Sequence, residues 1–138
     1  MEQYHGTNLA SATLIATGHI DVNRGGGELG KGFYTGDLLF QAFNWAWHQY
    51  QTDKSVVVLN FDDDEFLLLE PLCLDLFMTH QYRRQIRDEG LTRTFEFGEN
   101  AIWAPVVGRE YHNFNQIKFE SIEAEGFLND TDVVKTIL

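Results

Sequence analysis

The chain has 138 residues, of which 43% are apolar and 14% aromatic, and these values predict a single domain, residues 1–138, with a core of its own. Eleven phenylalanines and only two prolines exclude a disordered chain, which needs low hydrophobicity as well as charge. The formal net charge of −11 argues against a partner held through its phosphate backbone, because such binding depends on clustered Lys and Arg. We interpret the best basic cluster, Arg83, Arg84 and Arg87, as a solvated helix face.

The first half of the chain predicts two strands and two helices around a glycine-rich loop. MEQYHGT alternates as a strand does, and residues 9–17 have near-helical apolar spacing before Gly18, which is expected to cap that helix. RGGGELGKG is expected to be a loop that leads into a short strand at 33–35. Residues 38–50 predict a helix, because apolar side chains recur at helical offsets after Asp37, a good N-cap residue.

The second half mixes β-like and helical patterns, without a repeat or a linker. KSVVVLNF, residues 54–61, is the strongest strand pattern, since β-branched side chains suit a buried strand. We expect an acidic turn in DDDEF, a second strand in LLLEPL and a helix over residues 74–89 that ends at Gly90. RTFEF, AIWAPVV and NFNQIKFESI are β-like, and a short helix is expected around residues 133–138. The whole pattern predicts an α+β fold with segregated elements.

Cysteine content and hydropathy bear on the compartment. Cys73 is the single cysteine, so it forms no internal disulfide, and its leucine neighbours predict a small core residue rather than a nucleophile. The sequence shows no charged-then-apolar N-terminal segment, and no apolar run approaches the roughly twenty residues of a membrane span. We therefore expect a cytoplasmic protein with no membrane partner.

Familiar catalytic and metal patterns are missing from the sequence. No HxH, HExxH or CxxC spacing occurs, and we interpret DDDE at residues 62–65 as an acidic turn, so no metal is expected. The histidines are scattered, at His5, His19, His48, His80 and His112. GGGELGKGFY places a lysine in a glycine-rich loop but lacks the GxxxxGK[ST] spacing of a P-loop.

Three segments, taken together, carry a resemblance. YHGT stands at residues 4–7, GKGFYT at 30–35, and the helix after Asp37 contains Asn44 and Trp45. In order and spacing these segments resemble the NAD-binding half of the ADP-ribosyltransferase superfamily, in the branch with a His-Tyr-Glu signature. That branch includes the poly(ADP-ribose) polymerases and small bacterial, toxin-type domains. Trp45 follows Tyr34 by eleven residues, as the second aromatic of the family does, and NFNQIKFES after IWAPVVGR resembles the third motif.

The resemblance implies a fold, an activity and a set of site residues. It implies split, mainly antiparallel sheets that pack together with helices around them, and an enzyme that cleaves NAD and transfers ADP-ribose to a macromolecular acceptor. Such a reaction passes through an oxocarbenium-like state with a neutral leaving group, so the enzyme chiefly orients and supports its substrate. The implied catalytic residues are His5, Tyr34 and Gln116, and the implied NAD-binding residues are His5, Gly6, Thr7, Lys31, Gly32, Tyr34 and Trp45.

The resemblance also implies individual roles. His5 would hydrogen-bond the adenosine-side ribose, and Gly6 would let backbone groups approach the nicotinamide carboxamide. Thr7 would bind the nicotinamide end, whose cationic ring suits walls made by Tyr34 and Trp45. Lys31 would steady the pyrophosphate, and the glycines around it would let the loop close on the dinucleotide. For Trp45 and Lys31, packing in the core and exposure in a loop remain open alternatives.

The third motif departs from the family at its central acid. The aligned position is Gln116, which accepts a hydrogen bond but holds no charge and takes no proton. Glu120 shares its strand face but lies roughly 13 Å along the strand, which makes it a poor substitute. Gln116 therefore disfavours polymer synthesis and leaves mono-ADP-ribosyl transfer or NAD hydrolysis. A module that binds NAD, ADP-ribose or a protein without catalysis is the third alternative.

The acidic composition slightly favours a protein over a nucleic acid as acceptor. By analogy with small free-standing relatives, the resemblance implies a bacterial toxin or effector with an antitoxin or immunity protein as partner.

Overall fold

A computed structural model describes residues 1–108 and 114–138 and confirms the α+β class. The strands are β1 (Glu2–Asn8), β2 (Gly26–Gly27), β3 (Gly30–Lys31), β4 (Phe33–Gly36), β5 (Lys54–Asn60), β6 (Leu72–Cys73), β7 (Ala101–Pro105), β8 (Asn115–Phe119) and β9 (Val134–Ile137). The helices are α1 (Leu9–Ala16), α2 (Leu39–Tyr50), the 3₁₀ turn η1 (Gln51–Asp53), α3 (Asp63–Leu67), α4 (Leu76–Asp88) and α5 (Ile122–Asn129). No helix in these two ranges is long and apolar enough to span a membrane.

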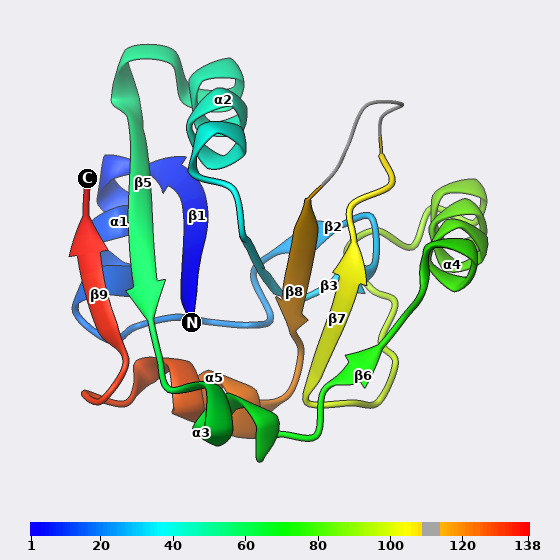
Figure 1. Cartoon of the computed structure of the whole chain (residues 1–138). Coiled ribbons are helices and arrows are strands. Elements are labelled where there is room, and N and C mark those ends of the chain that lie inside the picture. The colour runs from blue at the N-terminus through cyan, green and yellow to red at the C-terminus, as the bar shows by residue number, and fades with distance from the viewer. Residues whose placement is uncertain (109–113) are drawn as a thin grey trace.

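The main sheet consists of two halves that meet at one residue pair (Figure 1). Within the described residues it has seven strands in the order β6-β7-β8-β4-β1-β5-β9, and only β6 and β7 run parallel. β1 pairs with β5 over seven residue pairs, but with β4 only at Tyr4 and Gly36. The expected two packed sheets are thus one mainly antiparallel sheet, divided at the β1–β4 junction, with β2 and β3 as a small separate sheet.

Two helices begin and end where local chemistry predicts. The Asn8 side chain accepts from the Ser11 N–H at 2.8 Å to cap α1, and Gly18 follows the helix at a φ of 81°. Asp75 caps α4 in the same way, and Gly90 ends it at a φ of 68°. Glycine adopts such angles without the steric cost of a side chain.

The start of α2 differs from the prediction. Its N-cap residue is Leu38, with no side-chain cap, whereas Asp37 was expected to cap it. The Asp37 carboxylate instead accepts from the backbone N–H of Asn115 at 3.0 Å and from its side-chain amide at 3.1 Å. A tertiary contact with the start of β8 therefore replaces the local cap.

The second half shows several corrections. The acidic turn is the short helix α3, capped by Asp62, and acids in a first turn are favourable at the positive end of a helix. The segment 93–97 is not a strand, because Phe95 and Phe97 pack against Tyr82 in an aromatic cluster. In LLLEPL only Leu72 begins a strand, and Cys73 is exposed rather than in the core.

The C-terminal segment differs from the prediction, which placed a helix only around residues 133–138. Residues 122–129 form α5, which begins after Ser121 accepts from the Ala124 N–H. Residues 134–137, expected as a helix, form the edge strand β9 that pairs with β5. Long-range pairing with β5 decides this outcome, and no local pattern encodes it.

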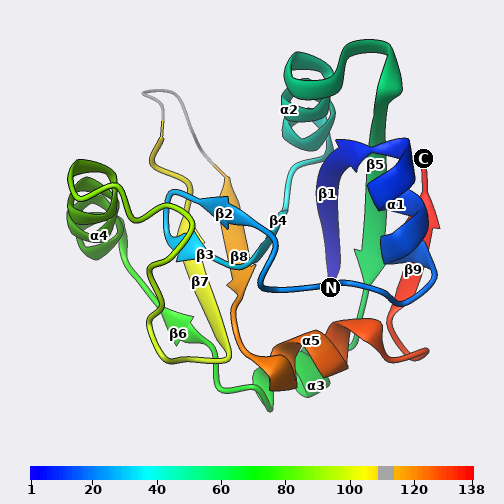
Figure 2. The same ribbon diagram turned by 180° about the vertical axis from the view of Figure 1, so that it is seen from behind.

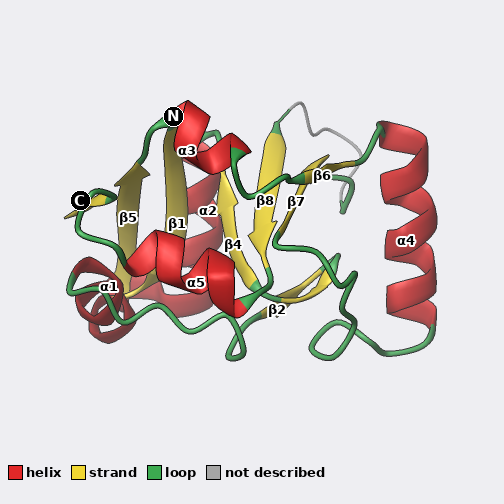
Figure 3. Ribbon diagram, turned by 90° about the horizontal axis from the view of Figure 1, so that it is seen from below, coloured by secondary structure: helices red, strands yellow, loops and turns green. Residues whose placement is uncertain are grey.

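The core has two parts on opposite sides of the sheet. Figures 2 and 3 show α3 and α5 at the same end of the strands. The larger cluster joins the sheet to α1, α3 and α5 and contains Ala12, Ile15, Ile20, Val22, Phe33, Val57, Leu59, Phe61, Phe66, Leu69, Ala101, Ile117, Phe119, Ala124, Leu128 and Val133. The smaller cluster is made by Leu29, Leu74, Ile102 and Ala104, with Tyr34, Tyr82 and Phe97 packed against it. This second cluster anchors the glycine-rich loop beside β4 and β8.

Candidate active site

A cleft of about 820 Å³ lies where the two halves of the sheet meet. It is bordered by β1, β4, α2, the glycine-rich loop and the segments that follow β7 and precede β8. Seven of the eight predicted site residues line it, namely His5, Gly6, Thr7, Gly32, Tyr34, Trp45 and Gln116. Segments far apart in the sequence therefore converge on one cavity.

His5 is fixed at the junction by a hydrogen bond and a stacked ring. Its Nδ1–H donates to the Tyr34 carbonyl at 2.6 Å, and its ring stacks on Phe33 with centroids 4.3 Å apart. Because a carbonyl only accepts, Nδ1 must carry the proton. Burial lowers the pKa of His5, and the bond to Tyr34 opposes that effect only in part. The neutral imidazole therefore has Nε2 as an acceptor.

The Tyr34 side chain ties β4 to the glycine-rich loop. Its hydroxyl donates to the Gly30 carbonyl at 2.6 Å and accepts from the Leu29 N–H at 3.1 Å. Burial raises the pKa of this hydroxyl, so it stays protonated. A Cβ on Gly27 would lie 2.7 Å from the Tyr34 ring, so the loop packs directly on the aromatic face.

The loop glycines make close approaches to protein. A Cβ on Gly30, whose φ is 92°, would lie 2.3 Å from the Phe95 carbonyl oxygen, and one on Gly32 would lie 2.7 Å from Lys118 Cγ. A Cβ on Gly6 would lie 2.4 Å from the Ala42 carbonyl oxygen of α2. Packing against protein therefore accounts for these glycines, whereas the sequence suggested approach to a dinucleotide.

Lys31 does not line the cleft. Its Nζ pairs with the Glu96 carboxylate and donates to Asn23 Oδ1 at 2.8 Å. The ion pair lowers the pKa of Glu96. These contacts fit the alternative of a loop lysine.

Trp45 lies on the α2 wall with 47% of its surface exposed. Its ring meets Tyr50 edge-on, with centroids 6.0 Å apart. The neighbouring Trp47 is similarly exposed but lies outside the cleft lining, where Lys54 Nζ sits 5.0 Å from its ring centroid. α2 thus offers one tryptophan inside the cleft and one outside it.

Gln116 is buried and directly contacts a carboxylate. Its Nε2 donates to Glu28 Oε1 at 2.5 Å and to the Pro105 carbonyl at 3.2 Å. Glu28 Oε1 also accepts from the Val107 N–H at 2.9 Å, and Oε2 lies 3.7 Å from Arg83 Nε. Glu28 lines the cleft and was not predicted, although it is the only acid in RGGGELGKG.

The Glu120 carboxylate forms its contacts outside the cleft. Lys118 Nζ lies 2.6 Å from its Oε1, and both side chains are buried. The Glu120 carboxylate also accepts from the N–H groups of Phe97, Gly98 and Glu99. Desolvation lowers the pKa of Lys118, while Glu120 opposes this shift. Gln116, Lys118 and Glu120 share a strand face as expected, but Glu120 does not line the cleft.

The cleft is much less acidic than the rest of the chain. Among the described residues, its lining includes two acids, Asp21 and Glu28, and five basic side chains, those of Arg24, Arg93, His5, His19 and His48. The guanidinium of Arg93 donates to the backbone carbonyl of Arg24 at 2.7 Å, so the Arg93 side chain lies beside the Arg24 backbone. Neither arginine was predicted, because 69 residues separate them.

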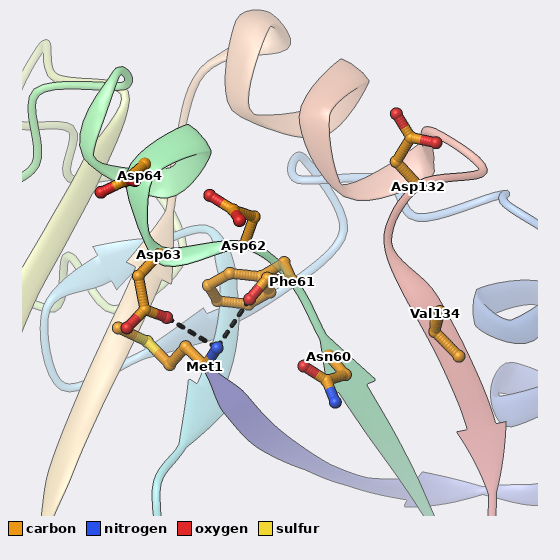
Figure 4. Close-up of a pocket in the computed structure, with 8 residues that line it drawn as sticks. All are labelled: Met1, Asn60, Phe61, Asp62, Asp63, Asp64, Asp132 and Val134. Carbon is orange, nitrogen blue, oxygen red and sulfur yellow. Dashed lines mark hydrogen bonds and ion pairs between the residues drawn. The ribbon is translucent and has the colours of Figure 1, made fainter.

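A second, acidic pocket of about 650 Å³ lies at the end of β5 and contains Asp62, Asp63, Asp64 and Asp132 (Figure 4). Asp63 pairs with the N-terminal ammonium at 2.6 Å, and Asp62 caps α3. Among the residues that the structure describes, no group of three His, Cys, Asp or Glu side chains is placed to hold a metal ion. His112 and Arg109 lie outside the described residues.

The sequence matches no protein-family model and no curated protein. The functional interpretation therefore rests on the geometry of the cleft and on the three motifs.

Proposed function

We propose that this chain is a NAD-dependent mono-ADP-ribosyltransferase with an ADP-ribosyltransferase-like fold. The observation that carries the proposal is the convergence of His5, Tyr34, Trp45 and Gln116, from four separate elements, on one cleft at the sheet junction. The division of the sheet supports it as well, because β1 pairs with β4 only at Tyr4 and leaves the rest of that edge without a strand partner among the described strands. A dinucleotide would lie along this edge.

The tautomer of His5 suits a ribose. With Nδ1–H committed to the Tyr34 carbonyl, Nε2 accepts a hydrogen bond from a hydroxyl group. The adenosine-side ribose offers such a donor. A protonated His5 would lose this acceptor, so its lowered pKa favours binding near neutral pH.

The nicotinamide end would meet Gly6, Thr7, Tyr34 and Trp45. Backbone groups on the free edge of β1 would pair with the carboxamide, and the aromatic rings would face the cationic pyridinium. Orientation of this kind is the main contribution an enzyme makes when the leaving group is neutral.

Arg24 and Arg93 would face the pyrophosphate in place of Lys31. Two guanidinium groups in a cleft with few acids attract a doubly charged anion, even on a protein with a net charge of −11. The acidic remainder of the surface favours a protein acceptor over a nucleic acid. A chain that modifies a macromolecular acceptor in this way would serve as a toxin or effector, and an antitoxin or immunity protein would be its partner.

NAD hydrolysis on the same site is the second candidate, and Gln116 favours it over polymer synthesis. The test is release of nicotinamide from NAD by the purified protein, with and without a cell lysate, using NAD labelled in the adenosine part. We expect turnover in wild type that is lost in His5→Ala and Tyr34→Ala, and label on lysate protein.

Free ADP-ribose without lysate would identify a glycohydrolase. Binding of NAD by calorimetry without turnover would leave a non-catalytic module, and neither binding nor turnover would overturn the proposal.

A further inference from the structure

The cleft contains a carboxylate that the third motif itself lacks. Gln116 Nε2 lies 2.5 Å from Oε1 of Glu28, which comes from the glycine-rich loop 88 residues earlier. We propose that Glu28 is the catalytic carboxylate and that Gln116 is a positioning residue that holds it. This inference rests on the proposed NAD chemistry.

Three segments fix the Glu28 carboxylate. Oε1 accepts from Gln116 and from the Val107 N–H, and Arg83 Nε stands 3.7 Å from Oε2. All three partners are donors, which suits an ionised carboxylate. Among the described residues Oε2 has no hydrogen bond, so it remains an acceptor on a side chain that is 16% exposed and lines the cleft.

The loop around Glu28 is anchored on both sides. Leu29 is fully buried, and its N–H donates to the Tyr34 hydroxyl. Gly27 packs on the Tyr34 ring, and Gly30 has the φ of 92° that favours glycine. Glu28 is therefore held on a constrained segment beside Tyr34, as a reacting group must be.

Two other described acids lie in or near the cleft region, and their contacts make them unsuited to this role. Glu120 is saturated by Lys118 and three backbone N–H groups outside the lining. Asp21 lines the cleft, but it is exposed and its Oδ1 accepts from the Asn23 N–H. Of the acids that the structure describes, Glu28 alone lines the cleft and contacts Gln116.

The reaction assigns two tasks to Glu28. Its negative charge would stabilise the developing cation, and Oε2 would accept a hydrogen bond from a hydroxyl of the nicotinamide ribose. The bond from the anomeric carbon to nicotinamide breaks, and its electron pair leaves with the now neutral nicotinamide. The acceptor, a protein nucleophile or water, bonds to the anomeric carbon and passes its proton to the Glu28 carboxylate, which returns it to solvent.

The test compares nicotinamide release by wild type, Glu28→Gln, Gln116→Glu and the control Glu123→Gln, an exposed glutamate of α5. We expect a loss of about 100-fold or more in Glu28→Gln, as for removal of a general base. Gln116→Glu puts two carboxylates in contact and is expected to lower the rate as well. Glu123→Gln should match wild type.

Each outcome decides a different point. If wild type turns over NAD and a folded Glu28→Gln keeps its rate within three-fold, the role of Glu28 is overturned and the proposed function stands. If Glu28→Gln does not fold, Gln116→Glu decides, because a rate above wild type would mean that the acid belongs at position 116. A wild type that releases no nicotinamide overturns both proposals.

Discussion

Gln116 and Lys118 lie two residues apart on β8, and each contacts a carboxylate from outside that strand. The two pairs differ in which oxygen atoms of the carboxylate lack a hydrogen-bond donor. In the closed pair, Lys118 and Glu120 are buried and every Glu120 oxygen has donors. In the open pair, Gln116 contacts Oε1 of Glu28, whose Oε2 has no hydrogen bond among the described residues and whose side chain lines the cleft. The two carboxylates therefore differ in exposure to the cleft and in how many donors they have, and the proposed chemistry falls on the one with a free acceptor.

Neutralising the closed pair should give the largest effect. Glu120→Gln leaves the Lys118 charge buried without its counterion, and loss of one partner of a buried ion pair costs about 3–5 kcal/mol. Glu28→Gln keeps an acceptor for Val107 and should cost about 1 kcal/mol. Urea unfolding of both variants measures how much free energy of unfolding each of them loses. Equal losses would show that the two pairs do not differ as described.

The wall of the cleft depends on the close packing of β1 on α2. Gly6→Ala places a Cβ 2.4 Å from the Ala42 carbonyl oxygen, and overpacking of this kind costs about 1–3 kcal/mol. Gly36→Ala is the matched control in β4, because its Cβ would meet nothing closer than 3.7 Å. Thermal unfolding should show a lower Tm for Gly6→Ala only. A Tm for Gly6→Ala equal to that of wild type would mean that β1 and α2 move apart enough to accommodate the added methyl group.

The stability of the protein should depend on pH through His5, which lines the cleft. Its pKa is about 6.5 in the unfolded chain and lower in the folded protein, because burial disfavours the charged ring. Between those two values the unfolded chain binds more protons, so the free energy of unfolding falls as the pH drops below 6.5. Denaturant unfolding at pH 7.5 and 5.5 should show a larger loss in wild type than in His5→Gln. An equal loss of stability in wild type and His5→Gln would mean that a group other than His5 titrates between these two pH values.

Lys31 should show the smallest effect. Lys31→Met removes an ion pair to the exposed Glu96, and exposed pairs contribute about 0–1 kcal/mol. Because Lys31 does not line the cleft, NAD affinity by calorimetry should stay within two-fold of wild type. A ten-fold weaker affinity would restore Lys31 as a pyrophosphate ligand.

Elements with their own local signals were predictable from the sequence. Asn8, Asp75, Gly18 and Gly90 mark helix ends through side-chain caps and backbone angles. The β-branched run of β5 marks a buried strand that has a neighbour on each side. Where such signals exist, the predicted and observed boundaries agree closely.

Elements that depend on distant partners were not predictable. β9 becomes a strand because β5 offers an edge, and the alternation of Phe95 and Phe97 serves an aromatic cluster with Tyr82. Asp37 is a sound N-cap residue, but Asn115 competes for its carboxylate. In each case a contact far along the chain outweighs local preference.

The candidate site divides in the same way. His5, Tyr34, Trp45 and Gln116 were found by motif spacing, and the structure brings them to one cleft. Glu28, Arg24 and Arg93 were missed, since only the folded loop places them beside residues 69 to 88 positions away.

The measurement that tests the central claim most directly is a calorimetric titration of NAD into wild type, Trp45→Ala and Trp47→Ala. The two tryptophans lie on the same helix with similar exposure, and only Trp45 lines the cleft. Because an aromatic face over a cation contributes about 1–2 kcal/mol, we predict that Trp45→Ala weakens NAD binding by about ten-fold while Trp47→Ala leaves it unchanged. Equal affinities in all three proteins, or no heat of binding in wild type, would contradict a NAD site at the junction of the two halves of the sheet.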